Sequence, residues 1–244
     1  MKAYGLIGYP LTHSFSEKYF AEKFKAENIT DCVYKLYELP DIQAFPALLK
    51  SIPNLHGLNV TVPHKEKVMA YLDEVEAEAK KIGAVNVIKF QNGRTTGYNS
   101  DYQGFIQSLE NFYPIKAGAQ ALIFGTGGAA KAVLAALDAM GIAYKIVSRQ
   151  PQPGQLHYNN LTTDLLTEYS LLINATPLGT YPKVDTCPDL PYEALTGNHY
   201  LYDLVYNPAE TLFLKKGREA GAKTKNGHEM LVRQAEVAWE IWNR

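Results

Sequence analysis

The stretch Ala121-Leu-Ile-Phe124-Gly125-Thr-Gly127-Gly128-Ala-Ala130 lies halfway along the chain and decides its fold. An apolar run breaks there into glycines, and a helical pattern of apolar residues follows at once. This order predicts a strand, a glycine turn and a helix. Glycines let the chain turn tightly and let backbone N–H groups approach a phosphate at the helix N-terminus. The loop favours dinucleotide binding, and the alternative is an ordinary turn between strand and helix.

The residues expected at the dinucleotide phosphates are Gly125, Thr126, Gly127, Gly128 and Ala129. The next predicted strand ends at Ser148 and Arg149, where NAD-binding folds place an acidic residue for the ribose 2′-hydroxyl. A guanidinium beside a hydroxyl suits a 2′-phosphate instead, so this pair favours NADP over NAD. The alternative reading of Arg149 is a solvated surface side chain.

The length and the position of the glycine loop together indicate two domains. A chain of 244 residues has room for one large or two modest domains, and a cofactor loop at residue 125 leaves a complete unit before it. We expect a substrate-binding and catalytic domain over residues 1–101 and a Rossmann-like dinucleotide-binding domain over 102–228. The predicted C-terminal helix, 229–244, is expected to pack back onto the first domain.

The composition indicates which classes of binding partner and which cellular compartment to expect. With 24 basic and 25 acidic residues the net charge is −1, which argues against nucleic acid and against an anionic membrane surface. Cys32 and Cys187 form neither a disulfide framework nor a metal cluster, and they fit free thiols in a reducing cytosol. We find neither a signal peptide nor a membrane span, and therefore expect a soluble cytoplasmic protein, monomeric or homodimeric, without a metal.

Alternating strand-like and helix-like runs predict an α/β fold on both sides of the loop. In the first half we expect strands at 3–7, 33–37, 58–62 and 85–90, a hairpin from the last of these to 95–98, and helices at 16–26, 42–52 and 71–82. In the second half we expect strands near 122, 144–147, 171–173 and 200–204, and helices at 102–112, 129–140, 163–168, 211–220 and 229–242. Residues 150–160 are turn-rich and are expected to form a loop.

Three polar segments in the first half carry candidate chemistry. Ser14 and Ser16 enter the first predicted helix, where they suit a carboxylate; alternatively, Ser14 and Glu17 form a capping box. Asn59 and Thr61 share one side of a strand that a proline ends. Lys65 follows that strand, and a lone lysine is otherwise a solvated surface group.

Asp101 opens a predicted helix, and is a candidate N-cap or a partner that tunes the pKa of the Lys65 ammonium.

These segments together with the glycine loop resemble the shikimate dehydrogenase family, over nearly the whole chain and in the family's order. The matching motifs are Gly8–Ser16, Asn59–Lys65, Gly83–Asn86, Asn99–Asp101, Gly125–Ala130, Asn174–Gly179, Asp203–Pro208, Thr211–Leu214 and Met230–Gln234. Two differences concern the cofactor: a single arginine stands in Ser148–Pro151 where the family pattern has a second basic residue soon after, and Gly227-His-Glu229 replaces a more glycine-rich run.

The resemblance implies reversible, NADPH-dependent reduction of 3-dehydroshikimate to shikimate, a step of aromatic amino acid biosynthesis, in a cleft between the two domains. It implies that Ser14 and Ser16 bind the substrate carboxylate and that Lys65 is the catalytic acid/base with Asp101. Substrate contacts are implied for Asn59, Thr61, Asn86, Asp101, Tyr206 and Gln234, and cofactor contacts for the glycine loop, Ser148, Arg149, Thr176, Leu204 and Gly227.

Two other functions stay open. A quinate/shikimate dehydrogenase that uses NAD is disfavoured because Arg149 has no acidic neighbour at the strand end. A non-catalytic, ligand-sensing member of the fold would lack the acid/base pair, whereas Lys65 and Asp101 are both present.

Overall fold

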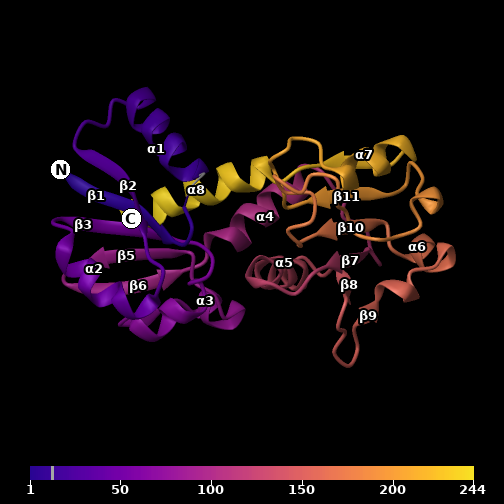
Figure 1. Cartoon of the computed structure of the whole chain (residues 1–244), viewed down its shortest axis with the longest axis horizontal. Helices are drawn as coiled ribbons and strands as arrows, with labels where there is room; N and C mark the ends of the chain where they lie inside the picture. The colour runs from indigo at the N-terminus through magenta and orange to yellow at the C-terminus, as the bar shows by residue number, and fades with distance from the viewer. Residues whose placement is uncertain (12–13) are drawn as a thin grey trace. The chain divides into compact units, whose positions relative to one another are not determined.

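The computed structural model of the protein describes residues 1–11 and 14–244, and it divides the chain into two compact units. The first unit consists of Met1–Ser100 and Ala235–Arg244, and the second consists of Asp101–Gln234. Each unit is built on one sheet with helices on both faces (Figure 1). The α/β class expected from the alternating runs is therefore confirmed in both units.

The sheet of the first unit has the strand order β2-β1-β3-β5-β6-β4. Its strands are β1 (Lys2–Gly8), β2 (Cys32–Glu38), β3 (Leu55–Val60), β4 (Glu74–Val75), β5 (Val87–Gln91) and β6 (Arg94–Tyr98). Strand β1 pairs in parallel with β2 and β3, whereas β5 pairs antiparallel with β3 and β6. The expected hairpin is confirmed: Asn92 and Gly93 join β5 to β6, both at positive φ, as the tight turn requires.

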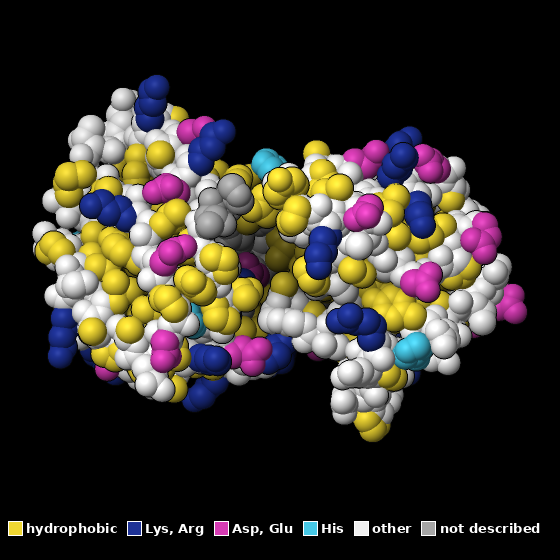
Figure 2. Space-filling model, in the orientation of Figure 1, with side chains coloured by type: hydrophobic (Ala, Val, Ile, Leu, Met, Phe, Trp, Pro, Cys, Tyr) yellow, Lys and Arg dark blue, Asp and Glu magenta, His cyan; other side chains and the backbone are white. Residues whose placement is uncertain are grey.

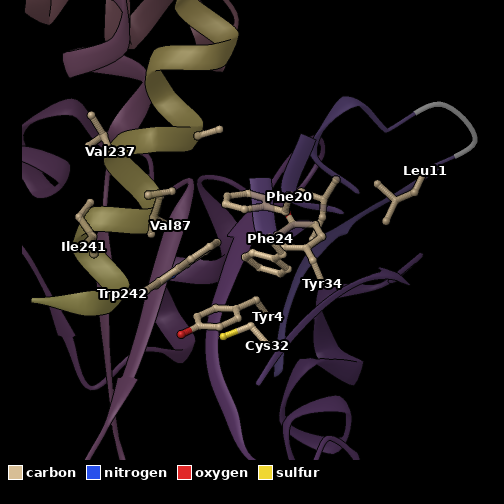
Figure 3. Close-up of a cluster of buried hydrophobic side chains, with 13 residues drawn as sticks. Tyr4, Leu11, Phe20, Phe24, Cys32, Tyr34, Val87, Val237, Ile241 and Trp242 are labelled. Carbon is tan, nitrogen blue, oxygen red and sulfur yellow. The ribbon is translucent and has the colours of Figure 1, made fainter. Parts of the chain in front are cut away.

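Successive residues of β1 point to opposite faces of the sheet and enter different cores. Leu6 belongs to a core that α1 (Phe15–Ala26) and the end of α8 (His228–Asn243) cover, and Ile7 belongs to a core on the other face. Figure 3 shows the first of these, where the aromatic side chains of Tyr4, Phe20 and Trp242 come from β1, α1 and α8. The other face is covered by η1 (Ile42–Ala44), α2 (Phe45–Ser51), η2 (Lys67–Tyr71) and α3 (Ala77–Ile82).

Helix α8 is locked to the sheet at Trp242. The indole Nε1 donates to the backbone oxygen of Ile88 at 3.1 Å. Gly57 lies directly beneath the ring, because a Cβ at that position would overlap the indole. Only glycine therefore lets the tryptophan seat on the sheet.

The helix expected over residues 71–82 is wrong in its first half. Strand β4 stands there instead, and α3 begins only at Ala77. The reason is a pair of side-chain contacts that outweigh the helical pattern. The Asp73 carboxylate accepts the Thr95 backbone N–H at 2.7 Å, which ties this segment to β6, and Glu76 caps α3 by accepting from Glu78 and Ala79.

The sheet of the second unit is parallel throughout, in the order β12-β11-β10-β7-β8-β9. The strands are β7 (Gln120–Phe124), β8 (Ala143–Ser148), β9 (Leu156–His157), β10 (Leu171–Asn174), β11 (Tyr200–Asp203) and β12 (Lys223–Lys225). The chain proceeds from β7 to β8 on one side and later to β10 on the other, so the strand order reverses beside β7. This is the topology of the dinucleotide-binding Rossmann fold.

The helices of the second unit lie on both faces of its sheet. They are α4 (Ser100–Glu110), α5 (Gly128–Ala139), η3 (Tyr158–Asn160), α6 (Thr163–Glu168), η4 (Tyr192–Ala194) and α7 (Leu212–Glu219), with the first turns of α8. Ile123 of β7 packs with α4 and α5, while its neighbour Phe124 packs with α6 and α7. Residues 150–160, expected to be a loop, contain β9 and η3, because Ser148 and His157 continue the parallel pairing of β8 and β9.

The surface carries both signs of charge. On the face drawn in Figure 2, basic and acidic side chains are interspersed among hydrophobic ones. Among the helices in the described residues, none is long and apolar enough to cross a membrane.

Candidate functional site

The glycine loop leaves backbone donors and open space at the start of α5. Gly125 has φ +105°, and a Cβ there would lie 2.9 Å from the Thr176 methyl carbon, so both the turn and the neighbouring loop require glycine. A Cβ on Gly127 or Gly128 would meet only open space. The N-cap of α5 is Gly127, which has no side chain to accept from the first N–H groups of the helix, so within the described residues these groups are available to an anion.

A cavity of about 990 Å³ lies along the carboxyl ends of β7, β8 and β10 within the second unit. Part of its wall was expected from the sequence: Gly125, Thr126, Gly127, Ser148, Arg149 and Thr176. Of the other residues predicted at the cofactor, Gly128, Ala129, Leu204 and Gly227 are outside this lining as far as the described residues show. The cavity has the volume and position of a dinucleotide pocket.

Gly227 and Leu204 lie together, although neither lines that cavity. A Cβ on Gly227 would overlap the backbone oxygen of Leu204, and the Gly227 N–H donates to the backbone oxygen of Val205 at 3.2 Å. The start of α8 therefore packs directly on the segment that follows β11. Glu229, which the sequence left without a role, accepts from Asn111 at 2.8 Å and pairs with Lys225 at 2.5 Å, so its observed contacts are structural.

A buried polar network holds the loops after β10 and β11. The Asn174 amide donates to Asp203 Oδ1 at 2.9 Å, and its oxygen accepts from the backbone and hydroxyl of Thr176 at 3.0 and 2.6 Å. The carboxylate of Asp203 also accepts from Val205 N–H at 2.9 Å and from the Thr211 hydroxyl at 2.5 Å. Burial raises the pKa of Asp203 to about 6, against the opposing effect of these three donors. The network fixes Thr176 in the cavity wall.

The first unit carries a second polar site, at the entrance of α1. Ser14 is the N-cap residue of α1 but makes no capping hydrogen bond, so the capping box that the sequence offered beside carboxylate binding is wrong. Its Oγ is buried and has no hydrogen-bond partner among the described residues. Thr12 and His13 of the same motif lie outside the described residues. A buried, unpartnered hydroxyl is costly to keep, which marks Ser14 Oγ as a group that a ligand can satisfy.

Ser16, Tyr34 and Asn59 form one hydrogen-bonded group beside Ser14. The Tyr34 hydroxyl donates to Asn59 Oδ1 at 2.8 Å, and it also bonds to the Ser16 side chain. Burial raises the pKa of Tyr34, and the bond from Ser16 opposes this. Tyr34 was not expected from the sequence; it lies on β2, and only the parallel pairing of β1 with β2 and β3 brings it beside Asn59.

Thr61 and Lys65 follow the end of β3. A Cβ on Gly8 would overlap the Thr61 methyl carbon, so the first residue of the motif Gly8–Ser16 lies against the middle of the motif Asn59–Lys65. Lys65 is half-buried, and its backbone oxygen accepts from Val85 N–H at 2.8 Å, which fixes the turn that carries the ammonium. His64 is buried and bonds through Nε2 to Leu39 O at 2.5 Å, so it also holds this turn in place.

Asn86 links the two motifs that precede α4. Its side chain accepts from Ser100 N–H at 2.7 Å and donates to Ser100 Oγ at 3.0 Å, while its backbone oxygen accepts from Val60 N–H at 2.9 Å. Helix α4 therefore begins at Ser100, and Asp101 lies in its first turn rather than at the N-cap as one reading expected. The amide of Asn86 is held in place by this capping contact.

Asp101 lies in the first turn of α4, and Gln234 lies in the part of α8 that belongs to the second unit. Both side chains are buried, each about 8% exposed. A Cβ on Gly104 would lie 2.8 Å from the backbone nitrogen of Gln234, and Gly104 shares a helix face with Asp101 one turn earlier. Tyr206 follows β11 and is half-buried, which raises the pKa of its phenol.

Much of the cavity wall consists of residues that were not predicted from the sequence. His157, Tyr158 and Asn159 line the cavity from the end of β9, and residues 177–189 supply most of the remainder, including Lys183 and Asp189. The sequence does hold a signal for the first group. A short strand follows the turn at Gly154, and a Rossmann-like sheet is expected to have a further parallel strand beside β8. For residues 177–189 we find none, because the segment is irregular.

The chain is similar to known proteins over almost its full length. Residues 6–88 match the family described as the shikimate dehydrogenase substrate binding domain. A protein of Clostridium beijerinckii named shikimate dehydrogenase (NADP(+)) is 41% identical over 251 residues, which cover 99% of this chain and 92% of that protein.

Two solved structures share the architecture. A shikimate dehydrogenase from Aquifex aeolicus superposes with a TM-score of 0.89 at 32% identity, covering 100% of this chain and 92% of that one. A shikimate 5-dehydrogenase from Thermus thermophilus, in complex with NADP(H) and shikimate, superposes with a TM-score of 0.85 at 31% identity, covering 99% and 93%.

Proposed function

This chain belongs to the shikimate dehydrogenase family, and we propose that it catalyses the reversible, NADPH-dependent reduction of 3-dehydroshikimate to shikimate, an oxidoreductase reaction at a CH–OH group. The observation that carries the proposal is the 41% identity to a curated NADP-dependent relative, which extends over both units and not only over the cofactor fold. The reaction is a step of aromatic amino acid biosynthesis. The free thiols Cys32 and Cys187 support a cytoplasmic location.

The second unit fits NADP on three counts. Gly127 and Gly128 leave space where side chains would obstruct a pyrophosphate, and α5 offers free N–H groups there. Arg149 is exposed on the cavity wall, where its guanidinium can bind a 2′-phosphate. Thr176 is held in the wall by Asn174, which suits contact with the nicotinamide end. When bound, the cofactor supplies the hydride.

The first unit supplies groups that suit the acid end of the substrate. Ser14 Oγ has no partner among the described residues, and the Ser16 hydroxyl lies in the group that includes Tyr34 and Asn59. We assign both serines to the substrate carboxylate. Asn59 and Thr61 stand on the same side of the strand and its extension, which places an amide and a hydroxyl where they can bind ring hydroxyls.

Lys65 performs the proton transfer in this proposal. Reduction of the carbonyl places negative charge on its oxygen, and an ammonium that donates a proton there stabilises the charge and completes the alcohol. In the reverse direction the neutral amine accepts that proton. An arginine could not do this, because its guanidinium does not lose a proton near neutral pH. Asp101 is assigned with Lys65 to the acid/base chemistry, and its carboxylate to accept from a ring hydroxyl.

Three further residues complete the proposed substrate site. Asn86 has a second amide hydrogen and a second oxygen lone pair beyond its bonds to Ser100, so it can also bind a hydroxyl. Gln234 donates through Nε2 to Leu231 O at 2.8 Å, which orients its amide group, and we assign the amide to a ring hydroxyl. Tyr206 carries a half-buried phenol, and we assign this side chain to contact with the substrate.

Steady-state rates with shikimate and quinate, each with NADP and NAD, test the proposal. We expect the highest kcat/KM for shikimate with NADP. A higher kcat/KM with NAD would overturn the cofactor assignment, and a higher value with quinate would overturn the substrate assignment. Binding of shikimate without turnover would instead identify a ligand-sensing protein.

A further inference from the structure

Strand β9 places His157 beside the residues assigned to the 2′-phosphate. Ser148 at the end of β8 and His157 at the end of β9 are directly paired Cα partners in the parallel sheet. Arg149 follows Ser148 by one residue, and all three line the same cavity. The side chain of His157 therefore belongs to the same edge of the sheet as the Arg149 guanidinium.

The ring of His157 is oriented by its own turn. Nδ1 accepts the backbone N–H of Asn159 at 3.1 Å, and the His157 backbone N–H donates to Asn160 Oδ1 at 2.8 Å, which forms a reciprocal cap on η3. A ring that accepts at Nδ1 carries its hydrogen on Nε2. The described residues provide no hydrogen-bond acceptor for that Nε2, and the half-buried ring lines the cavity.

Because charges of both signs lie at this edge of the cavity, we expect the 2′-phosphate to need more than one hydrogen-bond donor. The pKa of Tyr158, the next residue, is raised by burial, lowered by nearby Arg149 and raised by Asp189. The guanidinium and the Asp189 carboxylate thus both lie within electrostatic reach of one phenol. A carboxylate on this wall repels a bound phosphate. A single arginine therefore binds the phosphate, with its three acceptor oxygens, less strongly than an arginine together with a second donor would.

We propose that His157 donates from Nε2 to the 2′-phosphate of NADP, as the partner of Arg149 that selects NADP over NAD. The inference rests on the NADP use proposed above. His157 thereby supplies the second donor that the segment after β8 lacks. Lys183 lines the same cavity, but it comes from the irregular segment after β10, and the sheet pairing gives it no fixed position beside Arg149.

Calorimetric binding of 2′,5′-ADP and of 5′-AMP to the full chain tests this directly. The variant His157→Asn keeps an acceptor near the Nδ1 position, and so keeps the cap on η3, but it removes the Nε2 donor. We expect it to weaken 2′,5′-ADP binding about tenfold, which corresponds to one hydrogen bond to a charged group, and to leave 5′-AMP binding unchanged. His157→Gln retains an N–H at longer reach and should recover part of the loss.

Three results would overturn the inference: an unchanged affinity of His157→Asn for 2′,5′-ADP, an equal loss for both ligands, or a selective loss in Lys183→Met with none in His157→Asn. These outcomes are separate from failure of the proposed function. Binding of 2′,5′-ADP involves no shikimate, so a chain that binds it through His157 but does not oxidise shikimate would refute only the substrate assignment.

Discussion

The buried carboxyl of Asp203 makes the stability of the second unit depend on pH in an unusual direction. Its pKa is raised from 3.8 to about 6 in the folded chain, because burial outweighs the three hydrogen bonds that it accepts. Between these values the folded state holds a proton that the unfolded state has released. The free energy of unfolding therefore falls as pH rises through this window. The two pKa values differ by about two, which corresponds to about 3 kcal/mol.

The variant Asp203→Asn removes this titration while keeping an oxygen for Val205 N–H and the Asn174 amide. Relative to this variant, the wild-type chain should lose about 2 kcal/mol of unfolding free energy from pH 4 to pH 7, because the carboxyl of the unfolded chain is already partly ionised at pH 4. Urea unfolding at several pH values measures this. Far-UV circular dichroism is the appropriate signal, because both tryptophans, Trp239 and Trp242, belong to the first unit.

Thr211→Ser is the matched control, because it keeps the hydroxyl that donates to Asp203 Oδ2. It should show the same pH dependence as the wild-type chain. Parallel stability curves for the wild type and Asp203→Asn would refute the reasoning, since they would mean that Asp203 is ionised in the folded chain throughout this range.

Two further predictions concern the ligand sites. Arg149→Ala should raise the KM for NADP much more than the KM for NAD, because only NADP carries the 2′-phosphate; steady-state kinetics with both cofactors measure this, and equal changes would remove the phosphate assignment. Ser14→Ala should leave the melting temperature within about 2 °C of the wild type, because Ser14 Oγ has no partner to lose among the described residues, while raising the KM for shikimate about tenfold. A large fall in melting temperature with an unchanged KM would show a structural role instead.

The regular parts of the fold were predictable because their patterns are local. The glycine loop sits between β7 and α5 as its sequence predicts, and the helix over Thr163–Glu168 matches its predicted bounds. Where side-chain contacts decide, the pattern failed. Asp73 and Glu76 break the helix expected over 71–82, and the hydrogen bonds that do so come partly from a strand some twenty residues away.

Site residues were predictable where their own side-chain chemistry and local motif indicate a role. They were not predictable where only the pairing of strands brings a residue beside the site. Arg149 and Thr176 line the cavity as expected, but His157 and Tyr34 were missed, because only the strand register places them beside Ser148 and Asn59. Ser14 shows the converse case. Its spacing to Glu17 suggests a cap, yet its hydroxyl has no bond to any described residue of the folded chain.

The rate of shikimate oxidation by Lys65→Ala tests the central claim most directly, with Lys67→Ala, which changes an exposed lysine two residues away, as its control. The account predicts that Lys65→Ala lowers kcat by roughly 10²- to 10⁴-fold with a modest change in KM, while Lys67→Ala has wild-type kinetics. An unchanged kcat in Lys65→Ala would contradict the role of this residue in proton transfer.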